Sequence, residues 1–321
     1  MANDRAPKAA GELLKTLPTL ARRPKAPQRL IEAAVLLGAP TDPLSVLYQH
    51  SVLCQTCLPF RDPGEASRTW ERSNGSVKLK VLAGEAMHPE SGEFVPVGLP
   101  FGPKARLVLM HINQQALLSQ SPVIEIEETL TRFVRRMLRL STDGRTIRVV
   151  KDQLARLSAS SIRLGLLRQG QAITVNSQVI TAFDIWFPKN ERQRVLWPST
   201  VQLSLDYWES LKHHAVPLDE TAIGALTHSA LALDIYAWLA QRLHRVPESG
   251  GTLIPWPMLY QQFGVGYGRL EDFRKSFKVA LRQVIAVYPR ARVELDGRGM
   301  LAKHSQPPIP YQTKRLVEKS V

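Results

Sequence analysis

One stretch of the chain, residues 255–298, constrains the fold more than any other. It contains a short helix candidate that begins at Pro255, and a glycine-punctuated turn over residues 264–268 follows. A long helix candidate covers 270–288 and ends at Pro289. Asp296-Gly297 then separates two short alternating runs, which is a strong hairpin signal. A short helix, a turn, a long helix and a hairpin in this order are typical of a winged helix-turn-helix.

The charge of this stretch indicates its partner. The apolar residues of the long helix are spaced by three and four, so they share one face, and basic residues fall on an adjoining face. Residues 268–303 hold nine Lys/Arg and four Asp/Glu. A cationic helix beside a basic hairpin favours contact with a phosphate backbone over a merely solvated helix face. The candidate DNA-binding residues are Arg269, Arg274, Lys275, Lys278, Arg282, Arg292 and Arg298.

A similar order of elements occurs earlier in the chain. Helix candidates over 104–118, 127–140 and 145–157 precede a hairpin formed by 161–168 and 171–179. Residues 132–168 hold ten Lys/Arg and two Asp/Glu, so this is the most basic folded segment. Some of these arginines could instead pair with carboxylates on neighbouring turns. The candidate DNA-binding residues here are Arg145, Arg148, Lys151 and Arg156.

These two orders predict an α+β fold of two tandem winged-helix domains, each a helix-turn-helix with a β-hairpin wing. The expected division is a basic flexible tail over 1–27, an N-terminal domain over 28–190, a C-terminal domain over 199–305 and a tail over 306–321. Residues 188–198 are polar and charged and are the expected linker. A sheet continuous across Val179 and Val201 would contradict this division. Residues 61–75 are expected to form a polar loop.

The totals bound the class of protein. The chain has 321 residues, 44% of them hydrophobic, which is ordinary for a globular protein. Its net charge of +14 favours a polyanionic partner, of which nucleic acid is the commonest, over an anionic membrane surface. No apolar run approaches the roughly 18 residues of a membrane span, and no signal peptide is expected. Two cysteines exclude a disulfide scaffold, so a cytoplasmic location is expected.

The sequence lacks the residue sets of three kinds of chemical site. Cys54 and Cys57 have zinc-knuckle spacing after His50, but a structural zinc needs four ligands and no second pair exists, so two semi-buried cysteines are the expected state. No phosphate-binding loop and no strand-borne histidine pair with a nucleophilic tyrosine occurs. We therefore predict no catalytic residues, no cofactor and no metal, that is, a protein that is not an enzyme.

Several segments resemble the plasmid-encoded RepA family of replication initiators. The run over 229–239 resembles that family's most distinctive segment. Residues 100–107 fit its first conserved helix, and 151–157 fit its Gln-centred basic helix. Trp256, Phe263, Phe273 and Phe277 with Tyr288-Pro289 resemble its C-terminal helix-turn-helix, so the resemblance covers roughly 94–289. It implies paired winged-helix domains and sequence-specific binding to origin DNA.

Two functions follow from this resemblance and from the charge. The first is an initiator that binds repeated origin sites (iterons) in double-stranded DNA, opens the origin and recruits host replication initiator and helicase-loading proteins, with autoregulation of its own gene. The second is a winged-helix transcriptional repressor without initiator activity. A homodimer in free solution and a monomer on each repeat are also expected.

Overall fold

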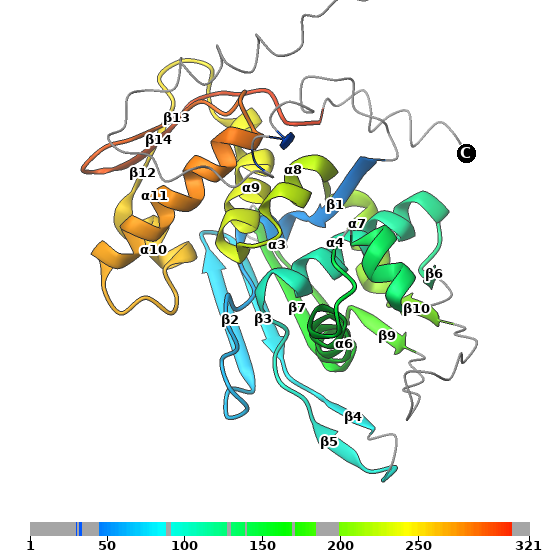
Figure 1. The fold of residues 1–321 in the computed structure, drawn as a ribbon. Coiled ribbons are helices and arrows are strands. Elements are labelled where there is room, and N and C mark those ends of the chain that lie inside the picture. The colour runs from blue at the N-terminus through cyan, green and yellow to red at the C-terminus, as the bar shows by residue number, and fades with distance from the viewer. Residues whose placement is uncertain are drawn as a thin grey trace, which may run out of the picture.

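The computed structural model describes residues 30, 32–33, 45–87, 91–126, 130–138, 140–168, 171–183 and 199–309. Helices and strands alternate along this part of the chain, in agreement with the expected α+β class (Figure 1). The predicted tail over 1–27 and the predicted linker over 188–198 lie outside the described residues, as does the predicted C-terminal tail beyond residue 309.

The C-terminal elements follow the sequence prediction closely. Strand β12 (Thr252–Pro255) leads into α10 (Trp256–Phe263), and α11 (Leu270–Val287) follows the glycine-punctuated turn. Strands β13 (Val293–Leu295) and β14 (Gly299–Ala302) form the hairpin, and β12 pairs with β14, so the sheet order is β12-β14-β13. Pro257 occupies the first turn of α10, where its missing N–H is not needed. The two predicted helices and the predicted hairpin are confirmed.

The N-terminal elements were also largely predictable. Helix α4 (Gly102–Ser119), strand β6 (Val123–Ile126) and helix α6 (Gly144–Ala159) follow one another, and strands β7 (Ser161–Arg168) and β8 (Gln171–Gln178) then form a hairpin. Asp143 caps α6 by accepting a hydrogen bond from the Thr146 backbone at 2.8 Å. Within the described residues the helix expected over 127–140 is irregular, because α5 (Leu130–Arg132) passes directly into a π-helical turn, η2 (Phe133–Met137).

The prediction of a loop over 61–75 was wrong for the C-terminal part of that range. Residues Thr69–Asn74 form strand β2, which pairs antiparallel with β3 (Val77–Leu82), and β3 pairs with β7 in a sheet of order β2-β3-β7-β8. Gly75 has φ of 57° in the turn between β2 and β3, the left-handed conformation that tight hairpins require. Residues Glu85–Met87 and Phe94–Pro96 form a further hairpin, β4–β5, which extends from the body of the molecule (Figure 1).

Two sheets cross the expected boundary between the domains. Strand β10 (Ser199–Leu203) lies between β6 and β9 (Ile180–Phe183), and Val201 is opposite Ile124 and Phe183. Strand β1 (Val46–His50) pairs with β11 (Ala215–Asp219). The sequence division placed the members of each pair in different domains. Strands from both sides of residues 188–198 therefore pair with each other in the same sheets. The division of the chain into two independently folding domains stays a prediction.

The remaining helices complete the core. Helices α3 (Ser51–Gln55), α7 (Leu205–His214) and α8 (Glu220–Leu226) are short, whereas α9 (Ala230–Arg242) is buried along nearly its whole length. A 3-10 turn, η3 (Leu243–Arg245), follows α9. Residues of α3, α4, α9 and α11 belong to one hydrophobic cluster, so a single core runs through the described residues.

A buried ion pair joins α4 to α9. Arg106 donates from Nε and Nη2 to the two carboxylate oxygens of Asp234, each at 2.6 Å. The same guanidinium donates to the carbonyl oxygens of Leu58, Pro59 and Gly102. The two side chains are almost fully buried, and all five N–H donors of the arginine have partners. This pair therefore fixes α4, α9 and the segment after α3 in one arrangement.

Candidate nucleic-acid interface

Helix α11 is fixed by an aromatic cluster. Phe273 and Phe277 point inward from α11, where they meet Trp256 and Phe263 of α10. The ring centres of Trp256 and Phe277 are 5.8 Å apart and meet edge to face, as do the rings of Trp238 of α9 and Phe263 at 5.2 Å. Because these side chains are fully buried, the opposite face of α11 is held toward solvent in one orientation.

Trp256 also organises the basic side chains of α11. The guanidinium carbon of Arg274 lies 5.2 Å from the centre of the Trp256 ring, and the Nζ of Lys278 lies 5.9 Å from it. Both distances are within the range of a cation–π contact. The indole N–H of Trp256 donates to the carbonyl oxygen of Asp296 in the hairpin turn at 3.0 Å. Trp256 is therefore a core residue that also links α11 to the hairpin.

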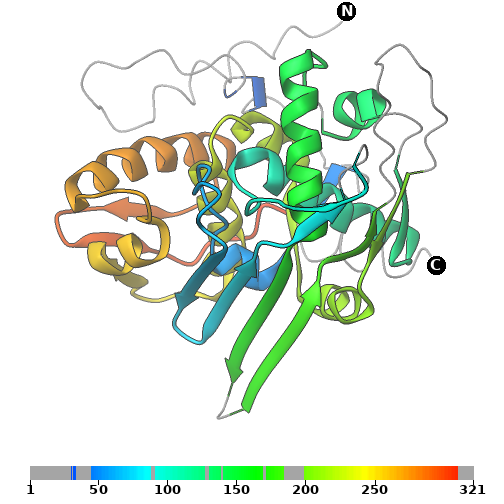
Figure 2. The same ribbon diagram turned by 90° about the horizontal axis from the view of Figure 1, so that it is seen from below.

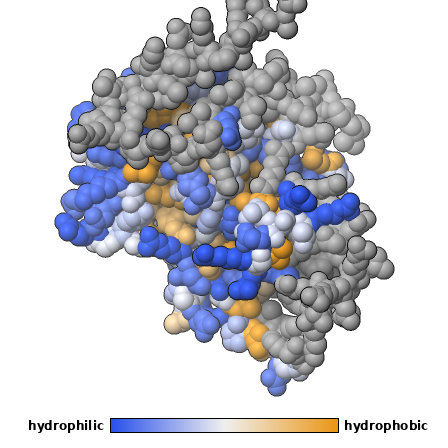
Figure 3. All heavy atoms as spheres, in the orientation of Figure 1, coloured by the Kyte–Doolittle hydropathy of each residue, from blue (hydrophilic) through white to orange (hydrophobic). Residues whose placement is uncertain are grey.

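The exposed face of α11 is cationic, with two carboxylates near its N-terminus. Lys275 and Arg282 are exposed and lie off the apolar stripe, as predicted. Lys275 makes an ion pair with Asp272 at 3.7 Å, and Arg269, at the N-cap, makes one of 4.0 Å with Glu271. Pairs this exposed are weak, so these side chains can turn toward another partner at little cost. Figure 3 shows that the edge of the molecule near α10, α11 and the hairpin is largely hydrophilic.

The hairpin is held close to the N-terminus of α10. An added Cβ at Gly299 would lie 2.1 Å from the carbonyl oxygen of Ile254, so β14 can approach β12 only with glycine here. Arg298 is exposed at the hairpin turn and donates to Asp296 at 3.0 and 3.1 Å. Hydrogen bonds from the backbone of Gly299 and Arg298 lower the pKa of the Asp296 carboxyl. Arg292, at the start of the hairpin, is also exposed.

Helix α6 carries the second group of predicted residues. Arg145 and Arg148 are exposed on α6, whereas Lys151 is half-buried. Figure 2 shows α6 and α11 as separate helices, with α11 beside the C-terminal hairpin and α6 leading into the β7–β8 side of the molecule. The structure therefore places the eleven predicted residues in two groups and does not bring them into one cluster.

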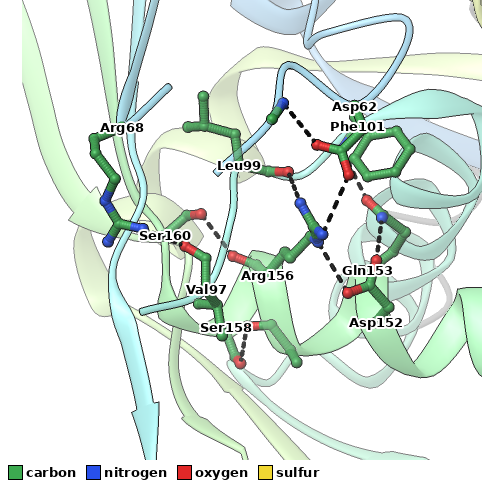
Figure 4. Close-up of polar contacts among 12 residues, drawn as sticks. Asp62, Arg68, Val97, Leu99, Phe101, Asp152, Gln153, Arg156, Ser158 and Ser160 are labelled. Carbon is green, nitrogen blue, oxygen red and sulfur yellow. Dashed lines mark hydrogen bonds and ion pairs between the residues drawn. The ribbon is translucent and has the colours of Figure 1, made fainter. Parts of the chain in front are cut away.

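Arg156 lies off the apolar stripe of α6, but its guanidinium contacts other parts of the chain. Its guanidinium donates to Asp152 at 2.9 Å, to the carbonyl oxygen of Leu99 at 3.2 Å and to Asp62 at 3.4 Å (Figure 4). It lies 5.0 Å from the Phe101 ring, and its side chain is only 15% exposed. Its donors already have partners within the chain, so Arg156 is a residue that positions α6 against the segment before α4. Contact of Arg156 with DNA stays a prediction.

The same junction contains other links. The Gln153 side chain accepts a hydrogen bond from the Phe101 backbone at 2.8 Å, and Arg68 donates to the Val97 carbonyl oxygen at 2.8 Å (Figure 4). An added Cβ at Gly98 would lie 2.2 Å from Nη1 of Arg156, so a larger residue here would displace the guanidinium. The N-terminal end of α4 and the middle of α6 are therefore locked together.

Sequence reasoning missed two exposed basic residues on the β2-β3-β7-β8 sheet. Lys78 of β3 and Arg163 of β7 are exposed, and the intervening partners Val77, Leu79 and Ile162 are buried. The register sets Lys80 opposite Arg163 and Lys78 opposite Gly165. The alternation of lysines with apolar residues over 77–81 was the signal that could have identified this face.

The candidate zinc ligands Cys54, Cys57 and His50 are buried or hydrogen-bonded within the protein. Cys54 and Cys57 are fully buried rather than semi-buried, and burial raises the pKa of the Cys57 thiol to about 12. The His50 ring accepts a hydrogen bond from the Val52 backbone and contacts the Ser210 hydroxyl at 3.0 Å. Within the described ranges, no group of three or more His, Cys, Asp or Glu residues could hold a metal ion. None of the helices described is long and apolar enough to cross a bilayer.

Comparison with known proteins identifies one family. The profile of a family described as plasmid encoded RepA protein matches residues 99–256. Two similar solved structures are crystal structures of domains 2 and 3 of RctB. The first, of residues 155–483, has 10% identity, a TM-score of 0.43 and coverage of 73% of this chain and 82% of its own. The second, a selenomethionine derivative, has 10% identity, a TM-score of 0.46 and coverage of 76% and 85%. No curated protein matches the chain.

The family match confirms the resemblance predicted from the sequence over the matched residues. It includes α4, α6 and α9 and ends at Trp256, the first residue of α10. The predicted resemblance of residues 257–289 lies beyond it. The chain therefore carries a plasmid encoded RepA segment, and α11 lies beyond it, after α10 and the glycine-punctuated turn.

Proposed function

We propose that this chain, which carries a plasmid encoded RepA segment over residues 99–256, is a replication initiator that binds repeated sites in double-stranded origin DNA. The observation that carries the proposal is the cationic outer face of α11, held rigidly by buried aromatic rings beside a basic hairpin. An exposed cationic helix of this kind fits the major groove, and the hairpin fits the adjoining backbone. The protein acts without catalysis, in the cytoplasm.

The connection of the C-terminal elements supports a winged helix. Its usual order is helix, strand, two helices and two strands, with the first strand paired to the last. Here α9, β12, α10, α11, β13 and β14 follow that order, and β12 pairs with β14. We propose that α4, α5, α6, β7 and β8 form a second winged helix, in which the hairpin is extended by β2 and β3. The two copies thus differ in how their sheets are completed.

Direct contact of α11 with DNA is tested by removing its outermost cations. Lys275→Ala and Arg282→Ala should each weaken binding, because both side chains are exposed and contribute little to the core. A phosphate contact lowers affinity on every sequence, whereas a base contact costs about 1–3 kcal/mol at one position. Lys212→Ala is the matched control, since this lysine is on α7, which lies away from α11 (Figure 1). Unchanged affinity in both α11 variants would show that this face is only solvated.

The arrangement of the DNA sites separates an initiator from a transcriptional repressor. We propose that the full-length protein protects tandem direct repeats in the replicon that encodes it, opens the adjacent segment and recruits host replication initiator and helicase-loading proteins. Protection of one inverted pair at a promoter, with no effect on plasmid maintenance, would favour the repressor. Light scattering of the free and repeat-bound protein tests the proposed change from a homodimer to a monomer.

A further inference from the structure

Helices α6 and α11 share an unusual arrangement of exposed side chains. On α6, Arg145 and Arg148 precede Val149 by four residues and by one, and on α11 Lys275 and Lys278 precede Val279 by the same spacing. Val149 is 36% exposed and Val279 is 54% exposed. The next residue of each helix, Val150 or Ala280, is buried, so the two patterns have the same orientation relative to the core. Each helix thus presents one valine among cations.

Folding does not account for these two valines. Neither belongs to the hydrophobic core, although the inward residues of both helices do. Valine is also a poorer helix former than alanine, lysine or arginine, so an exposed valine does not strengthen either helix. Isolated exposed apolar residues are common on proteins, but here the same combination recurs at the same spacing on the two helices proposed to bind DNA.

The chemistry of the major groove supplies a partner for an apolar side chain flanked by cations. The groove edge of each base pair carries hydrogen-bonding groups, and thymine adds one apolar group, the C5 methyl. A lysine or arginine lies four residues before each valine, and another lies one residue before it. These cations would hold the helix on the DNA backbone or on guanine edges. We infer that Val279 and Val149 each contact the methyl group of a thymine and so contribute to sequence specificity. This inference rests on the proposed function.

The experiment begins with a duplex that the full-length protein selects from a randomised library. Each thymine of that duplex is then replaced in turn by deoxyuridine, which removes the C5 methyl and leaves base pairing intact. For the wild-type protein we expect one position within the reach of each helix at which the replacement weakens binding about fourfold. This factor corresponds to ~0.8 kcal/mol for one buried methyl-sized group.

Substitution of the valines identifies which helix reads which thymine. Val279→Ala should weaken binding to the thymine duplex about fourfold and show no further loss when deoxyuridine replaces the thymine that Val279 contacts. It should keep the wild-type response at the position assigned to Val149, and Val149→Ala should show the converse. Val123→Ala is the matched control, because Val123 is 45% exposed on β6, lies in neither basic helix and should leave every affinity unchanged.

Two results would overturn the inference and leave DNA binding intact. The first is wild-type affinity and selectivity in both valine variants. The second is that each valine substitution weakens binding, but by the same factor whether or not any given thymine has been replaced by deoxyuridine. The valine would then contact none of the thymine methyl groups. If the library yields no preferred sequence and binding does not depend on salt, the proposed function itself fails and the inference fails with it. Thermal unfolding of the variants should match the wild type, since both valines lie outside the core.

Discussion

The buried pair of Arg106 and Asp234 provides the sharpest test of how this fold holds together. Asp234→Ala removes the carboxylate that accepts two charge-assisted hydrogen bonds, each 2.6 Å long, from a guanidinium that is 1% exposed. The arginine keeps its charge and its three backbone carbonyl partners, but two of its N–H groups lose their acceptors. Water cannot replace the carboxylate without opening the contact between α4 and α9.

The cost follows from burial. Breaking a buried ion pair by removing one partner costs about 3–5 kcal/mol, because an uncompensated charge remains inside. At roughly 2–4 °C per kcal/mol, a value for domains of 150–250 residues, the Tm should fall by about 6–20 °C. Total stabilities are about 5–15 kcal/mol, so the variant should remain folded at low temperature. The double variant Arg106→Met, Asp234→Leu should be more stable than Asp234→Ala, since it leaves no buried charge.

Thermal unfolding followed by circular dichroism and calorimetry gives the measurement. The control is Glu209→Ala, which removes an exposed pair with Lys212 at 2.7 Å and should cost well under about 1 kcal/mol. Because sheets β6-β10-β9 and β1-β11 cross the expected domain boundary, the wild-type protein should also unfold in one transition. A Tm for Asp234→Ala equal to that of Glu209→Ala would refute the reasoning about the pair.

Three further predictions follow from the described side chains. Arg156→Ala should destabilise the protein by about 1–3 kcal/mol, because the partners of the guanidinium each lose a hydrogen bond. The control Arg148→Ala should leave the Tm unchanged. Equal effects of the two substitutions on the Tm would contradict the positioning role of Arg156. If the eight exposed candidates (Arg145, Arg148, Arg269, Lys275, Lys278, Arg282, Arg292 and Arg298) meet phosphates, log K should fall with a slope of about −7 against log salt, and a slope near zero would exclude such contacts. Burial, with a smaller contribution from His214, lowers the pKa of His50 to about 3, below the unfolded value of ~6.5, so the unfolded chain binds a proton that the folded chain does not. Urea unfolding should therefore show about 2 kcal/mol of stability lost between pH 7.5 and pH 5 from this group, and His50→Gln should remove that part of the pH dependence.

The parts of the fold that could be predicted are those whose signals are local. Helix α11 was predictable because its apolar residues recur at three and four and Pro289 ends it, and the β13–β14 hairpin was predictable from Asp296-Gly297. Strand β2 could not be predicted, because Thr69–Asn74 is polar and the side chains on only one of its faces are partly buried. Its stability comes from pairing with β3 and from Arg72 over the Trp70 ring at 4.2 Å, neither of which a linear pattern reveals.

The candidate site was predictable to the same extent. Periodicity separated the exposed Lys275 and Arg282 correctly from the core of α11. It could not distinguish Arg156 from Arg148, since both lie off the apolar stripe of α6 and only the approach of Gly98 and Leu99 from elsewhere in the chain occupies Arg156. The pairing of β1 with β11 was also beyond reach, because it joins residues more than 160 positions apart, such as His50 and Ala215.

The shared sheets matter for how two DNA-binding helices would work on one chain. Two domains on a flexible linker accept many spacings between their sites, at an affinity set by the linker length. Here α4 is tied to α6 through Gln153, and to α9 through Asp234, and α9 packs against α11. Rigid elements therefore connect α6 to α11 without passing through residues 188–198. If both helices read DNA as proposed, the fold itself sets the distance and rotation between the two sites, so one inserted base pair between them should weaken binding as much as the loss of one site.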